Sequence, residues 1–252
     1  MIEISGVSKR YGETVVVDDV SLTIPKGGIT SIIGPNGAGK STLLSVIARI
    51  LAPDAGKVTV DELDVATTPG RSLARRLSFM RQDNHLTARL SVRDLVAFGR
   101  YPYSGGRLTA EDVSKIDESI GFVGLDDYRQ RFLDELSGGQ RQRAFVAMLL
   151  AQDTDYALFD EPLNNLDMRH AVATMKLLRR MADEFGKTIV IVLHDINFAS
   201  AYSDQIVAMR EGRVLHVGSV EHTIFSERLK EVFDIDVSIL ETGGRRIVDF
   251  YA

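Results

Sequence analysis

The chain has 252 residues, of which 44% are hydrophobic and 26% charged, the ordinary range for a soluble globular protein. Its formal net charge is −5, so it lacks the basic surplus with which nucleic-acid binders neutralise phosphates, and we expect no nucleic-acid partner. The absence of cysteine excludes disulfides and thiolate metal sites. The longest apolar run, residues 144–151, is far shorter than the roughly 20 residues needed to cross a bilayer, so work at a membrane would require a partner.

The first third of the chain predicts several short strands and one helix. The strands are expected at residues 2–10, 14–24, 29–34, 57–61 and 77–81, and the helix at 42–51. The first two strands alternate apolar and polar residues and are rich in Val, Ile and Thr, with a turn at residues 11–12. The third is short and mostly apolar and runs directly into a glycine-rich loop, and Pro53 stops the helix that follows.

Helices are expected to dominate residues 87–136, where amphipathic segments alternate with loops rich in Gly, Pro and Tyr. Beyond them the pattern predicts helices at 138–152, 168–184 and 226–233, strands at 156–160 and 188–193, and hairpins at 205–217 and around residues 243–244. Alternating strands and helices predict an α/β fold with a mostly parallel sheet covered on both faces. The stretch 87–136 is interpreted as a helical subdomain inserted into that fold.

The glycine-rich loop fits the phosphate-binding pattern G-x-x-x-x-G-K-[ST], between a strand and a helix as that pattern requires. Its glycines let the backbone wrap around phosphates, and the helix N-terminus offers donors to an anion. Lys40 would reach the β- and γ-phosphates, and Ser41 would bind Mg²⁺. A fortuitous glycine-rich turn is the alternative, and the correct context weighs against it. The predicted nucleotide-binding residues are Gly34, Pro35, Asn36, Gly37, Ala38, Gly39, Lys40, Ser41 and Thr42.

Two acidic residues end the mostly apolar strand YALFDEP, residues 156–162. Ligands of open α/β sheets bind where strands end, so these carboxylates are candidates for the same site. Asp160 could belong to the Mg²⁺ shell, and Glu161 could polarise a water molecule for in-line attack. In isolation, an acidic strand end that merely enters a loop would give the same pattern.

The motif LSGGQRQR, residues 136–143, marks the start of a helix. Ser137 and Gln140 have the spacing of a capping box, which is a structural role. Gly138 and Gly139 follow the cap and leave the helix N-terminus bare, so its amides can approach a phosphate. We expect both roles to apply.

These three motifs, in this order, resemble the ATP-binding cassette (ABC) family over essentially the whole chain. The resemblance implies a P-loop NTPase core with an N-terminal antiparallel β subdomain and an inserted α-helical subdomain. It implies one ABC nucleotide-binding domain divided into core and β subdomain (1–86 and 153–225), helical subdomain with the signature motif (87–152), and C-terminal helix and hairpin (226–252). Two subunits would pair head to tail, with the LSGGQ of one closing over the γ-phosphate held by the other.

Four further positions match residues to which the family gives a role. The resemblance places Tyr11 against adenine, although a plain turn tyrosine is the alternative. Gln82 would sense Mg²⁺ and the attacking water and link the site to the membrane partner, and Asp167 would cross the dimer interface. His194 would contact the γ-phosphate, although a histidine at a strand end is more often structural. The expected catalytic residues are therefore Lys40, Gln82, Glu161 and His194, and Tyr11 and Asp167 join residues 34–42 and 137–140 in the expected nucleotide-binding set.

The resemblance also implies partners and a location. The cofactors would be ATP and Mg²⁺, and ATP binding would form a homodimer at the cytoplasmic face of the cell membrane, peripheral to it. Two integral membrane permease subunits and an external solute-binding protein would complete the system. The stretches 98–103, 141–153 and 162–170 resemble ATPases of iron–siderophore importers, with haem and vitamin B12 importers as relatives. Leu163 and Met148 depart from many family members without touching the chemistry.

Three other functions remain open from the sequence. Soluble ABC ATPases of translation usually carry two cassettes, and those of DNA repair carry long coiled-coil inserts; neither feature is present. An exporter cassette is often fused to transmembrane helices, which the sequence lacks. A P-loop kinase would have no use for LSGGQ.

Overall fold

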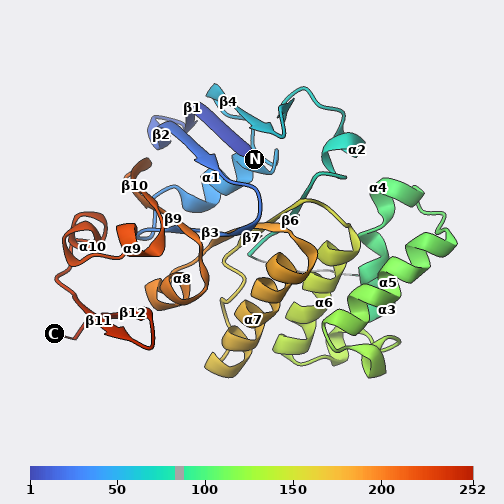
Figure 1. Cartoon of the computed structure of the whole chain (residues 1–252). Helices are drawn as coiled ribbons and strands as arrows, with labels where there is room; N and C mark the ends of the chain where they lie inside the picture. Colours follow the sequence, from blue (N-terminus) through green and yellow to red (C-terminus); the bar gives the residue numbers. More distant parts are fainter. Residues whose placement is uncertain (83–87, 252) are drawn as a thin grey trace. The chain divides into compact units, whose positions relative to one another are not determined.

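The computed structural model describes residues 1–82 and 88–251 (Figure 1). The chain divides into two compact units. The first consists of Met1–Thr68 and Thr188–Ala252, and the second is Pro69–Lys187. The expected boundaries at 86–87 and 152–153 both fall within the second unit, and the three-part division made from the sequence stays a prediction. Residues 83–87, where the helical stretch was expected to begin, lie outside the described residues.

An antiparallel sheet forms the N-terminal part of the first unit. Its strands, in the order β2-β1-β4-β5, are β2 (Thr14–Ile24), β1 (Ile2–Tyr11), β4 (Ala55–Val60) and β5 (Leu63–Asp64). Ile2 and Ile4 of β1 are buried and Glu3 and Ser5 exposed, which is the period-two pattern of a strand with one covered face; after an irregularity in the register the next buried residue is Val7. The turn expected at residues 11–12 is displaced by one residue. Tyr11 still pairs with Thr14, so the turn consists of Gly12 and Glu13.

The rest of the first unit is built on parallel strands. They are β3 (Gly28–Ile33), β8 (Thr188–Val192) and β9 (Gln205–Arg210), with β10 (Arg213–Gly218) antiparallel to β9. β3 pairs in parallel with β8 on one side and with β9 on the other. β8 is buried along its whole length, as expected for a parallel strand covered on both faces. Because parallel strands end at the same edge of a sheet, the segments that follow β3 and β8 leave from one edge.

Helices and a second hairpin surround these strands. They are α1 (Lys40–Ile47), α8 (Ile196–Tyr202), α9 (Val220–Thr223), α10 (Ser226–Phe233) and the hairpin of β11 (Ser238–Thr242) and β12 (Arg245–Asp249). α1 packs against β2 and β8, α8 packs against β3 and β12, and α10 packs against β9. The C-terminal helix and hairpin agree with the sequence prediction.

The second unit is mainly helical. It contains α2 (Gly70–Leu73), β6 (Leu77–Met80), α3 (Val92–Phe98), α4 (Tyr101–Ser104), α5 (Ala110–Phe122), η1 (Asp126–Tyr128), η2 (Leu133–Glu135), α6 (Gly138–Ala151), β7 (Tyr156–Asp160) and α7 (Met168–Phe185). β6 and β7 pair in parallel. α6 lies among α3, α5 and α7 and packs against all three (Figure 1). This explains the apolar run 144–151, of which all but Met148 is buried.

The expected α/β fold, with parallel strands, an antiparallel N-terminal sheet and a helical insertion, is confirmed. The helix expected at 42–51 instead spans Lys40–Ile47, because the chain already leaves the helix before Pro53: Arg49 adopts a left-handed φ of 56°. The short helices α2, α8 and α9 were not predicted, since so few residues give no readable period. Within residues 1–82 and 88–251, no helix is long and apolar enough to cross a membrane.

Candidate functional site

The loop between β3 and α1 is packed tightly against its neighbours in the first unit. Gly34, Gly37 and Gly39 all have positive φ, at 150°, 78° and 91°. A β-carbon at Gly39 would overlap the carbonyl oxygen of Val16, and one at Gly34 would overlap that of Met209. Only glycine fits where backbone approaches backbone this closely. The glycines therefore determine the backbone conformation of this loop, and such a conformation allows the loop amides to face a bound anion.

Lys40 is the first residue of α1 and is only 4% exposed. Its Nζ donates hydrogen bonds to the carbonyl oxygens of Gly34 and Pro35, both at 2.9 Å. A buried ammonium group needs such partners, and these two carbonyls hold the Lys40 ammonium group against the first residues of the loop. α1 has Gly39 at its N-cap and no side-chain cap. Positive charge, a helix N-terminus and left-handed glycines thus coincide, which suits a polyphosphate.

The other two residues predicted in the first unit lie at the same sheet edge or on the adjoining hairpin. His194 is exposed and lies two residues beyond the end of β8, and the amide of the intervening Leu193 donates to the carbonyl of Ile32 in β3 at 3.1 Å. Tyr11 is 50% exposed at the end of β1, and its hairpin partner β2 contacts Gly39. The fold thus groups Tyr11 and His194 with the glycine-rich loop.

In the second unit, β6 and β7 deliver polar residues at their shared carboxyl edge. Asp160 ends β7 and is 8% exposed. Glu161 follows with a φ of 48°, an uncommon conformation for a residue with a β-carbon. Its Oε2 accepts a hydrogen bond from Asn164 Nδ2 at 2.5 Å. Gln82 is exposed just beyond β6, so it leaves the strand pair at the same edge as the two carboxylates.

The predicted capping box at the start of α6 is present. Ser137 Oγ accepts from the amide of Gln140 at 3.3 Å, and Gln140 Oε1 accepts from the amide of Ser137 at 2.9 Å. A β-carbon at Gly138 would meet nothing within 4 Å, whereas one at Gly139 would overlap the ring of His170. The N-terminus of α6 is therefore open at Gly138 and covered by His170 at Gly139.

Asp167 is the N-cap of α7. Its Oδ1 accepts a hydrogen bond from the backbone amide of His170 at 2.8 Å and lies 2.7 Å from His170 Nδ1. The backbone hydrogen bond from His170, followed by its ring, holds the pKa of the Asp167 carboxyl below its ordinary value. The carboxylate therefore stays ionised. His170 was not singled out from the sequence, although an N-cap Asp followed three residues later by His was a usable signal.

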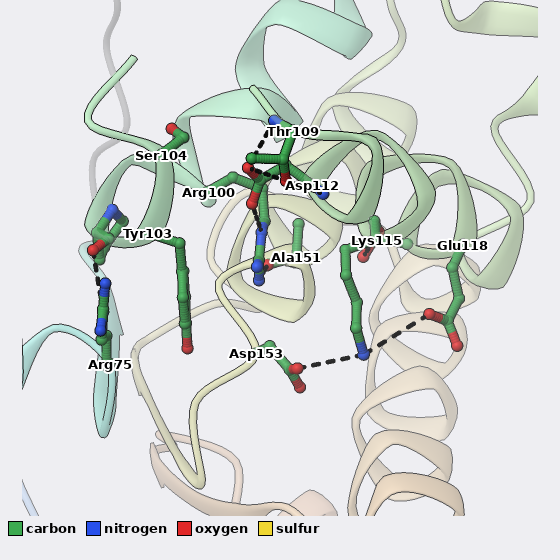
Figure 2. A network of polar contacts seen from close by, with 12 residues as sticks. Arg75, Arg100, Tyr103, Ser104, Thr109, Asp112, Lys115, Glu118, Ala151 and Asp153 are labelled. Atoms are coloured by element: carbon green, nitrogen blue, oxygen red, sulfur yellow. Dashed lines mark hydrogen bonds and ion pairs between the residues drawn. The ribbon is translucent and has the colours of Figure 1, made fainter. Parts of the chain in front are cut away.

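The opposite end of α6 is held by a buried ion pair (Figure 2). Arg100 Nε donates to Asp112 Oδ1 and Arg100 Nη1 donates to the carbonyl of Ala151, both at 2.8 Å, with both charged side chains 3% exposed. Burial pushes the pKa of Asp112 upward, but hydrogen bonds from Thr109 and Arg100 outweigh it and the pKa is lowered. The guanidinium also lies 4.0 Å from the ring of Tyr103. Arg100 thus ties α4 and α5 to the end of α6 that lies opposite Ser137.

The structure therefore gathers the predicted site residues in two groups, one in each unit. The first unit holds residues 34–42, Tyr11 and His194, and the second holds Gln82, residues 137–140, Asp160, Glu161 and Asp167. Residues 17–164 match the family profile described as ABC transporter. The chain belongs to the ABC transporter family.

Relatives match this ABC cassette over most or all of its length. It is 50% identical to the petrobactin import ATP-binding protein YclP of Bacillus subtilis (strain 168), covering 100% of both chains. It is 51% identical to the petrobactin import ATP-binding protein FatE of Bacillus anthracis, covering 96% of each. A solved dimeric structure of the bacterial ABC transporter cassette MJ0796 superposes with a TM-score of 0.77 at 30% identity, covering 87% of this chain and 99% of that one. The chain thus has the P-loop NTPase fold and is an ATPase that binds ATP.

Proposed function

We propose that this ABC ATPase energises the import of a ferric siderophore of the petrobactin type through a separate membrane permease. The observation that carries the proposal is the identity of about one half, over whole chains, to two proteins named for petrobactin import. The names of these relatives favour a siderophore as the imported substrate over haem or vitamin B12, whose importers the sequence also resembles.

The geometry of the glycine-rich loop supports MgATP as the cofactor. The loop lets backbone amides surround an anion, and the buried Lys40 carries a cation to its centre. In this proposal Lys40 contacts the β- and γ-phosphates and Tyr11 stacks on adenine. Mg²⁺ is usually held by substrate phosphates and one or two carboxylates; here Asp160 would supply a carboxylate, and Ser41 and Gln82 would add a hydroxyl and an amide oxygen.

Hydrolysis then requires a polarised water and stabilisation of the charge that develops on the phosphate. Glu161, whose carboxylate Asn164 orients, would polarise the water. Gln82 and His194 would contact the water and the γ-phosphate. The strained φ of Glu161 is of the kind that clusters at functional positions, which supports this assignment.

A second copy of the chain would complete each site. The open helix N-terminus formed by residues 137–140, together with Asp167, would serve the nucleotide held by the partner chain. The dimeric cassette structure of a relative supports this arrangement. The homodimer would work at the cytoplasmic face of the membrane with two permease subunits and an external solute-binding protein.

Glu161→Gln tests both parts of the proposal. The purified variant should bind ATP and accumulate as a dimer in gel filtration with MgATP, while hydrolysis falls roughly 10²–10⁴-fold because a positioned base is lost. In a deletion strain, uptake of radiolabelled ferric petrobactin should fail and return with the wild-type gene but not with Glu161→Gln. Hydrolysis near the wild-type rate would remove Glu161 from its role. Normal petrobactin uptake in the deletion strain, beside a defect for a sugar or peptide, would overturn the siderophore assignment.

A further inference from the structure

The imidazole of His170 lies directly against the second residue of α6. A β-carbon added to Gly139 would overlap the ring, with His170 Cγ and Nε2 at 2.7 Å from it. Gly139 is buried, whereas the neighbouring Gly138 is exposed and has open space beside it. The His170 ring therefore occupies the volume that a side chain at position 139 would fill, and it fixes the first turn of α6 from the side of α7.

The same ring is held from its other edge by Asp167. Nδ1 of His170 lies 2.7 Å from Asp167 Oδ1, and an ionised carboxylate can only accept, so Nδ1 carries the proton. The backbone amide of His170 donates to the same oxygen at 2.8 Å. Two hydrogen bonds to one oxygen set the orientation of the carboxylate and of the ring together. One imidazole thus joins the start of α6 to the N-cap of α7.

A second contact ties the same two segments. Gln142 Nε2, one turn into α6, donates to the carbonyl of Pro162 at 2.7 Å. The segment from Glu161 to Asp167 is itself folded by the hydrogen bond from the amide of Leu166 to the carbonyl of Leu163 at 3.2 Å. α6 and α7 also pack against each other (Figure 1). Residues 137–142 and 161–170 therefore form one connected element within the second unit.

We propose that His170 is a positioning residue that holds the signature motif and Asp167 in one rigid element, so that both engage the partner chain's nucleotide together. The inference rests on the proposed function, in which residues 137–140 and Asp167 act on the nucleotide of the partner. It adds a residue that would act by positioning residues 137–140 and Asp167, not by binding the nucleotide itself. Its effect should therefore appear in dimer closure and in the partner's site, not in nucleotide binding by the chain that carries it.

His170 makes two contacts, its ring against Gly139 and its Nδ1 with Asp167, and three substitutions in the Glu161→Gln background separate them. His170→Ala removes both contacts, His170→Phe keeps a ring against Gly139, and His170→Asn keeps a donor for Asp167. We expect His170→Ala to raise the ATP concentration for half-maximal dimerisation at least tenfold, with Phe and Asn intermediate. Binding of a fluorescent ATP analogue to the monomer should stay within twofold. Lys176→Ala, an exposed change on the same helix, is the matched control and should leave both measurements unchanged.

Mixed dimers locate the effect. Ser137→Arg chains mixed with Lys40→Ala chains retain one intact composite site, built from the loop of the first and the signature motif of the second. His170→Ala added to the Lys40→Ala chain should abolish the restored hydrolysis, whereas His170→Ala added to the Ser137→Arg chain should leave most of it. Equal effects in the two arms would overturn the inference.

The outcomes also separate this inference from the function on which it rests. If the Glu161→Gln parent does not dimerise with ATP, the composite-site function is wrong, and the inference falls with it. If the parent dimerises and His170→Ala dimerises at the same ATP concentration, only the role of His170 is wrong. If Asn and Phe both behave like Ala while monomer binding is retained, the two contacts are not what positions the element, and the inference is again overturned.

Discussion

The N-termini of α1 and α6 both contain glycines, yet they are built differently. α1 starts from a loop with three left-handed glycines, has no side-chain cap, and carries the buried Lys40 in its first turn. α6 starts at Ser137, whose capping box with Gln140 is complete, and its glycines are helical. The N-terminus of α1 combines a folded loop backbone with the charge of Lys40. The N-terminus of α6 has no such charge and is open only beside Gly138, which is called its open edge below.

This difference indicates what each terminus can do alone. A loop that supplies several amides and a cation can bind a phosphate within one chain. A helix edge whose cap is already satisfied contributes a partial positive charge and a few amides, which is weak unless another surface supplies the remaining contacts. Nucleotide affinity should therefore depend on the start of α1, and hydrolysis on both.

Ser137→Arg should have the largest effect of the changes considered, and only on hydrolysis. A bulky side chain at the open edge blocks approach of the partner's nucleotide, so hydrolysis should be abolished while the monomer binds ATP normally. Equilibrium binding of an ATP analogue and phosphate release measure the two separately. Weakened binding by the monomer would show that the start of α6 belongs to the chain's own nucleotide site and would remove the contrast.

Lys40→Ala should have the opposite profile, with loss already visible in the monomer. Hydrogen bonds to charged groups contribute about 1.5–3 kcal/mol, which corresponds to roughly a 10- to 100-fold loss of affinity. The same binding assay measures it, and Lys26→Ala, at an exposed lysine of the same unit, is the control. Affinity within twofold of wild type would mean that the backbone alone binds the phosphates.

The sequence predicted these two termini well because their determinants are local. Gly34, Gly39 and Lys40 lie within seven consecutive residues, and Ser137 and Gln140 within four, so each pattern is visible in a short stretch of sequence. The contact between Gly139 and His170 could not be predicted, because it depends on how α6 packs against α7. The buried pair of Arg100 and Asp112 was missed for a related reason: such residues are almost always exposed, and only the assembled helices show that these are not.

Tyr11→Ala should have a smaller effect on binding than the loss of Lys40. Base–aromatic stacking contributes about 1–3 kcal/mol, and Tyr11 lies half exposed at the end of β1, where its ring is accessible to a base. Tyr11→Phe keeps the ring and should bind ATP almost normally, which makes it the matched control. Equal affinity of the Ala and Phe variants would reduce Tyr11 to a structural residue of the hairpin.

The smallest expected effects come from a matched pair of glycines, one at each terminus. Added β-carbons at Gly37 and Gly138 would both meet nothing within 4 Å, but Gly37 has a φ of 78° whereas Gly138 is helical. Gly37→Ala should therefore cost about 1–2 kcal/mol in the free energy of unfolding, because its conformation disfavours a β-carbon.

Gly138→Ala should instead stabilise the chain by about 0.4–1 kcal/mol, because alanine restricts the unfolded state at no cost to the helix. Urea unfolding of the two variants measures both signs. If Gly138 faces the partner's phosphate, the stabilised variant should nevertheless hydrolyse ATP more slowly, since its methyl group occupies the open edge. A variant that is both more stable and fully active would show that the open edge of α6 is not used, and the contrast between the two termini would then be one of structure alone.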